Sequence, residues 1–142
     1  MPEVEFHTGI VDPVDFVSRM LRKAYRQGIR VLVVAPQQRL DQIDRSLWQL
    51  DERDFIPHAQ VAQLEAAAAA LTPIWLATEA TTQHPNPPAV IINAGAAVPA
   101  NAGTAQRLIE VVAAAPDDAA QGRENWRRYA AQGLSLKHLP AA

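Results

Sequence analysis

The chain has 142 residues, of which 13 are basic and 15 are acidic, for a formal net charge of −2. This length fits a single domain spanning residues 1–142, and a hydrophobic content of 49% excludes a disordered chain. The chain contains no cysteine, which excludes disulfides and thiolate chemistry and suits a reducing compartment. A dedicated nucleic-acid binder is usually basic, so direct DNA binding is not expected.

The first residues have neither the basic start nor the apolar core of a secretory signal. No apolar run approaches the length that spans a bilayer. We therefore expect a cytoplasmic protein that does not contact a membrane.

The first fifty residues predict two β-α units. Residues 4–7 alternate between apolar and polar side chains, as a half-buried strand does. Asp12 followed by proline is typical of a helix start, and Gly28 is placed to end that helix. Residues 29–34 are nearly all apolar, which favours a buried parallel strand, and Pro36 marks the next helix start. The order β-α-β-α implies a parallel sheet with right-handed crossovers.

The rest of the chain predicts further strands and a closing helix. The alanine run at 66–70 favours a helix, and the apolar runs at 74–77 and 89–93 favour strands. Residues 107–114 fit either a strand or a helix, because their apolar pattern has no clear period. A helix is predicted from Asp117 to about residue 132, with glycine after it. The pattern indicates an α/β domain with a mostly parallel sheet and a C-terminal helix.

Motifs for nucleotide, metal or nucleophile chemistry are missing. No G-x-G-x-x-G and no Walker A lysine occurs, and the turn after the first strand holds one glycine, Gly9. The four histidines are not paired at ligand spacing. Asp51, Glu52 and Asp54 could hold a metal, although Arg53 among them favours a solvated loop. We expect no cofactor, no metal and no catalytic residue, but sites can be built from distant residues, so a small nucleotide-dependent enzyme stays as the alternative.

Three blocks in order carry a resemblance to a known family. They are Gly28-Ile29-Arg30-Val31-Leu32, then Leu47-Trp48 with Phe55-Ile56-Pro57-His58, and the closing segment from Arg123 to Gly133. The chain resembles the chi subunit of the bacterial DNA polymerase III holoenzyme, whose members show a G-[KR]-[RK]-V-L strand, an F-[VI]-P-H turn and an R-x-x-[aromatic]-[KR]-x-Y-x-x-x-G helix. The order and spacing of the blocks cover most of the chain.

The resemblance implies a single-domain, Rossmann-like three-layer fold and a non-catalytic accessory subunit. It also implies two protein partners. One is the psi subunit of the clamp loader, and the other is the acidic, phenylalanine-terminated tail of single-stranded DNA-binding protein. The chain would then tether the replicase to coated DNA during DNA replication.

The closing helix holds the candidate binding residues. Arg123, Trp126 and Arg127 lie at i, i+3 and i+4 and share one helix face. On pattern alone, a solvated charged face with the tryptophan in the core is favoured; the resemblance instead implies that these residues bind the tail. Trp48 and Phe55 are expected as neighbours of the same slot, with Tyr129 and His58 as further candidates.

Charge is distributed unevenly along the chain. Between residues 59 and 106 only Glu65 and Glu79 are charged, so this stretch is either a surface covered by psi or ordinary core. Residues 121–138 hold four basic side chains and one acidic side chain, which suits an acidic partner. The chain departs from the family at Ala119, where members can carry a lysine, so part of the basic patch is missing.

Overall fold

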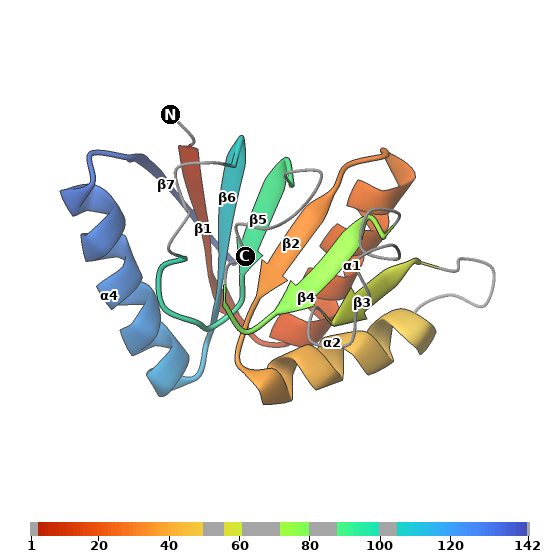
Figure 1. Cartoon of the computed structure of the whole chain (residues 1–142). Coiled ribbons are helices and arrows are strands. Elements are labelled where there is room, and N and C mark those ends of the chain that lie inside the picture. Colours follow the sequence, from red (N-terminus) through yellow and green to blue (C-terminus); the bar gives the residue numbers. More distant parts are fainter. Residues whose placement is uncertain (1–2, 50–55, 61–71, 80–87, 100–104, 142) are drawn as a thin grey trace.

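The computed structural model describes residues 3–49, 56–60, 72–79, 88–99 and 105–141, which form a seven-stranded sheet with helices on both faces (Figure 1). The elements are β1 (Glu3–Ile10), α1 (Pro13–Arg26), β2 (Val31–Val34), α2 (Gln37–Gln49), β3 (His58–Gln60), β4 (Ile74–Ala77), β5 (Val90–Asn93), β6 (Arg107–Ala113), α4 (Pro116–Ala131) and β7 (Ser135–Pro140). The strand order is β3-β4-β2-β5-β6-β1-β7, and every pair is parallel. The predicted Rossmann-like three-layer α/β fold is confirmed. The predicted alanine-rich helix at 66–70 lies outside the described residues.

The first β-α unit follows from its capping residues. The side chain of Asp12 accepts a hydrogen bond of 3.0 Å from the backbone N–H of Asp15, as an N-cap does. Pro13 is the first helical residue, where its missing N–H costs nothing. Gly28, with a φ of 72°, reverses the chain after α1 in a conformation that side chains disfavour.

Alternate residues of the central strands feed two separate cores. Val31 and Val33 of β2 pack with α1 and α2 on one face of the sheet. Leu32 and Val34 belong to the core on the other face, which includes Tyr129 of α4. Because both faces are covered, a parallel strand needs apolar residues at every position. This explains the unbroken apolar run that predicted the strand.

Residues 107–114, whose sequence pattern fits either a strand or a helix, contain the strand β6. It lies between β5 and β1, and all of its residues except Arg107 are buried. Burial on both faces replaces the alternation that a half-buried strand would show. The absence of a clear apolar period in this segment is therefore typical of a central strand that is buried on both faces.

Two strands were not predicted. β3 has three residues and follows Pro57, at a place interpreted from the sequence as a turn. β7 follows the C-terminal helix and pairs with β1 as an edge strand, with Leu136 and Leu139 only partly buried. Both are edge strands in the described sheet, and their side chains lack the apolar run of buried strands.

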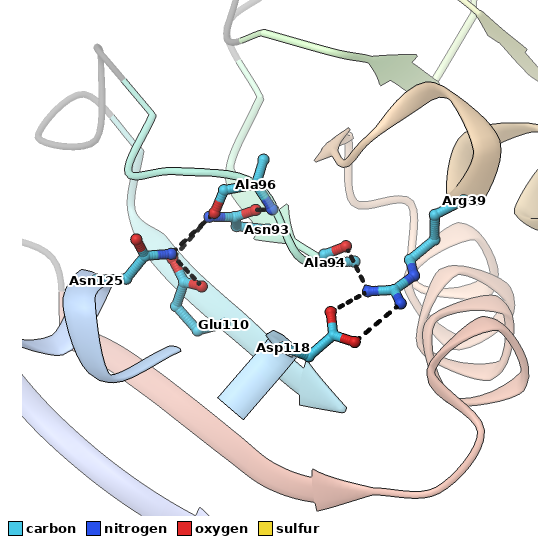
Figure 2. Close-up of polar contacts among 7 residues, drawn as sticks. All are labelled: Arg39, Asn93, Ala94, Ala96, Glu110, Asp118 and Asn125. Atoms are coloured by element: carbon cyan, nitrogen blue, oxygen red, sulfur yellow. Dashed lines mark hydrogen bonds and ion pairs between the residues drawn. The ribbon is translucent and has the colours of Figure 1, made fainter. Parts of the chain in front are cut away.

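An ion pair lies at the carboxyl end of β5, where doubly wound folds bind ligands. Arg39 of α2 donates to Asp118 of α4 at 3.0 Å and to the carbonyl oxygen of Ala94 at 3.1 Å (Figure 2). A Cβ atom on Gly95 would lie 2.6 Å from Nη1 of Arg39. The backbone thus approaches the guanidinium closely, and the ion pair ties the two helical layers together across this edge.

Candidate functional site

A cavity of about 600 Å³ opens between α4 and strands β1, β6 and β7. We call it the α4 pocket. Phe6 of β1, Val112 of β6 and Trp126 of α4 form its apolar part, and Arg123 and Arg127 of α4 stand beside them. Its volume lies within the range of roughly 300–1,000 Å³ that is typical of ligand sites. The described structure therefore places the three candidate residues of α4 at one cavity.

Small residues create the space. Ala113, Ala114, Ala119 and Gly122 all line the α4 pocket. A Cβ atom on Gly122 would lie 2.8 Å from Cγ1 of Val112, so α4 packs closely on β6 at this point. Glycine at 122 sets how near the helix comes to the sheet, and the alanines leave room beside that contact.

A β-bulge in β1 shapes the strand side of the pocket. His7 pairs with Val111 and Ile10 with Ala113, so three steps along β1 match two along β6. Gly9 in the bulge has a φ of 69°. The extra residue changes the face of the sheet on which the following side chains of β1 pack. Phe6 packs in the core beneath α4, whereas Ile10 packs in the core beneath α1. Thr8 and Gly9 are thereby left at the pocket.

Trp126 joins the core to the pocket. Its ring meets Phe6 edge-to-face, with centroids 4.9 Å apart, and lies 6.3 Å from the ring of His138. The side chain is partly exposed. Such edge-to-face arrangements are favoured between aromatic rings. Trp126 is therefore neither fully in the core nor fully solvated, and it presents an aromatic surface to the cavity.

The rim of the pocket is positive. Glu124 pairs with both Arg127 and Arg128 at 3.1 Å, all on the exposed side of α4. Arg123 makes no ion pair with the part of the chain that the structure describes. Among the described residues, none that lines the pocket is acidic. Because exposed ion pairs are weak, an incoming carboxylate can compete for Arg127 and can reach Arg123 directly.

A buried polar network holds α4 on the sheet. Glu110 of β6 accepts hydrogen bonds from Tyr129 at 2.6 Å, Asn93 at 3.0 Å and Asn125 at 3.4 Å. Burial raises the pKa of Glu110 to about 7, against the opposing effect of these donors. Burial and the neighbouring Glu110 raise the pKa of Tyr129. Tyr129 is fully buried in this network, so the structure gives it a supporting position beneath the helix.

The network also fixes the segment after β5. Asn125 donates to the carbonyl oxygen of Ala96 at 2.9 Å, and Asn93 bonds to the same residue (Figure 2). Together with the Arg39–Asp118 ion pair, these contacts anchor α4 at its first turn and at its middle. The rotation of α4, and with it the direction of Trp126, is set by these contacts.

Trp48 and His58 lie elsewhere. Trp48, which is 59% exposed, lies in the last turn of α2, with its ring 5.2 Å from that of His58. Helices α2 and α4 cover opposite faces of the sheet, and β3 and β7 are its opposite edges. The expectation that Trp48 and His58 neighbour the slot at Trp126 is therefore wrong. Phe55 lies outside the described residues.

His58 has a structural environment. Its Nε2 lies 2.7 Å from Asp44 and its Nδ1 lies 2.6 Å from the carbonyl oxygen of Ile56. The side chain is 1% exposed. Both ring nitrogens are thus occupied, and the histidine joins α2 to β3.

Sequence reasoning missed Phe6, Thr8 and His138 as pocket residues. Phe6 and Thr8 share a side of β1, but their role depends on the bulge that follows them. His138 belongs to β7, which was not predicted. The position of α4 over these strands is a tertiary feature, and the local pattern carries no signal for it.

The fold and the site define a Rossmann-like α/β domain that lacks the glycine-rich phosphate loop and has an apolar, arginine-rimmed pocket instead. The family model of DNA polymerase III chi subunit, HolC, matches residues 1–137. The chain belongs to this family, a non-catalytic accessory subunit of DNA polymerase III. The resemblance is thus confirmed, and the enzyme alternative is not supported. Among curated proteins, none matches the chain significantly.

Two further properties concern the described residues only. None of the helices in these ranges combines the length and apolar character that crossing a bilayer requires. No three histidine, aspartate or glutamate side chains in the described ranges gather closely enough to bind a metal ion. The acidic cluster Asp51, Glu52 and Asp54 lies outside them.

Proposed function

We propose that the chain is an adaptor of DNA polymerase III that binds the acidic, phenylalanine-terminated tail of single-stranded DNA-binding protein in the α4 pocket. A separate surface would bind the psi subunit of the clamp loader. The chain would then link the clamp loader to coated single-stranded DNA in the cytoplasm. It would do so without contacting DNA or membrane itself.

The α4 pocket carries this proposal, because it combines the two features that such a tail requires. Trp126, Phe6 and Val112 offer an apolar surface for a terminal aromatic ring, and Arg123 and Arg127 offer cations for carboxylates. Burying a phenylalanine contributes roughly 1.5–3 kcal/mol, and each hydrogen bond to a charged group contributes about as much. Two or three such contacts, less the cost of ordering the tail, suit an affinity on the order of micromolar.

The departure at Ala119 affects the same site. Ala119 lines the pocket one turn before Arg123, so a lysine there would add a cation at the rim. In this chain the rim depends on Arg123 and Arg127, and both are exposed. We expect binding that still weakens with salt, because the contacts are charged and accessible to screening.

The psi contact rests on the family alone. The charge-poor stretch 59–106 that could meet psi is described only at 59–60, 72–79, 88–99 and 105–106. Co-purification of the chain with psi tests this partner. A chain that binds psi and ignores the tail would be a structural subunit without the adaptor role.

Calorimetric titration of a tail peptide tests the residue assignment. Arg123→Ala should weaken binding about tenfold, the loss expected for one charged hydrogen bond. Arg128→Ala is the matched control, because Arg128 is also an exposed arginine of α4 but does not line the pocket. It should bind the peptide within about twofold of the unmodified chain. Equal losses in the two variants would contradict the assignment of Arg123.

A further inference from the structure

A second polar element faces the α4 pocket from the strands. Oγ1 of Thr8 on β1 lies 2.6 Å from Nε2 of His138 on β7, and both residues line the pocket. Nδ1 of His138 makes no hydrogen bond with any residue in the described ranges. The imidazole is therefore held by one nitrogen, and the other is available to a ligand.

The β-bulge of β1 lies next to this pair. Gly9 follows Thr8 in the bulge, and the nearest side-chain atom to a Cβ built there is that of Ala141, at 3.8 Å. Its φ of 69° disfavours any residue with a side chain. The bulge thus places a residue without a side chain next to Thr8, and the nearest side chain to it is that of Ala141.

The surroundings of the pair favour an anion. None of the described residues that line the pocket is acidic, and Arg123 faces it from the α4 wall. The ring of His138 lies 6.3 Å from that of Trp126. A ligand ring that packs on Trp126 would therefore place groups attached to it within reach of the imidazole.

We propose that the Thr8–His138 pair binds the C-terminal carboxylate of the acidic tail, while Arg123 and Arg127 bind its acidic side chains. This inference rests on the proposed function and adds how the end of the tail is recognised. The Thr8 hydroxyl donates to Nε2, so Nδ1 carries the proton and donates to the carboxylate. His138 is then a binding residue, and Thr8 is a positioning residue that fixes the tautomer and the direction of the ring.

The test compares two synthetic tail peptides, one with a free C-terminal carboxylate and one with a C-terminal amide. Amidation should weaken binding to the unmodified chain about tenfold, the loss expected for one charged hydrogen bond. His138→Phe keeps a ring beside Trp126 but has no nitrogen, so it should weaken the free-acid peptide about tenfold and bind both peptides alike. Arg123→Ala should still prefer the free acid, because it acts on a different part of the tail.

Two variants test whether Thr8 positions the ring of His138. Thr8→Val removes the hydroxyl and should reduce the preference for the free acid, and Thr8→Ser should restore it. Thermal unfolding of each variant checks that the domain is folded, and His138→Leu, which also lacks a nitrogen, replaces His138→Phe if the latter does not fold.

The possible outcomes separate the two claims. A variant at His138 that keeps the full preference for the free acid would overturn the carboxylate assignment and leave the adaptor role standing. Failure of both peptides to bind the unmodified chain would overturn the proposed function, and this inference with it.

Discussion

Glu110 shows how one buried residue supports a site that it does not touch. Glu110 is 2% exposed, and its carboxylate joins Tyr129 and Asn125 of α4 to the sheet. A buried carboxylate must be hydrogen-bonded or neutral, and here three donors partly offset the loss of water. The consequence is a helix fixed in rotation, with Trp126 directed toward the α4 pocket on the neighbouring side.

The raised pKa of Glu110 predicts a pH-dependent stability. The folded state keeps a proton that the unfolded chain releases above about pH 4.5, because the pKa rises from 4.5 to about 7. This contribution is fully present below pH 4.5 and is lost as the pH rises to about 7, by roughly 3 kcal/mol. Urea unfolding at several pH values measures it.

Glu110→Gln provides the control for this prediction. Burial lowers the pKa of His7 from 6.5, so His7 contributes stability that increases with pH and opposes the trend. The difference between the unmodified chain and Glu110→Gln isolates the carboxylate. The same pH slope in both proteins would show that Glu110 does not titrate as described.

At the scale of elements, the distance between α4 and β6 determines the pocket. Gly122 allows the close approach, and the alanines beside it leave the cavity. Neither α4 nor β1 forms the site alone, because the bulge in β1 supplies the opposite wall. The pocket is therefore a property of how a helix packs on a locally bent strand.

Gly122→Ala tests this packing. In an exposed helix the change would stabilise by about 1 kcal/mol, but here the added methyl would overlap Val112. Overpacking costs about 1–3 kcal/mol, so we expect a net loss of stability in urea unfolding. The double variant with Val112→Ala should lose less than the sum of the two single variants. A more stable Gly122→Ala variant would show that the contact is not tight.

At the scale of the whole molecule, local patterns predicted the layers but not the site. Capping at Asp12 and the apolar runs of β2 and β5 predicted the parallel α/β fold, because these signals are local. The face of α4 was predicted from the spacing of Arg123 and Trp126. The edge strand β7 and the β1 bulge were missed, since pairing partners decide them, and Trp48 was wrongly joined to the site because sequence order says nothing about opposite sheet faces.

The adaptor role is tested most directly by binding of the chain to intact single-stranded DNA-binding protein and to the same protein without its acidic tail. We expect saturable binding of the intact protein with a Kd on the order of micromolar and loss of that binding when the tail is removed. Equal binding of the two forms would contradict it, because the α4 pocket would then not be the contact that joins the chain to coated DNA.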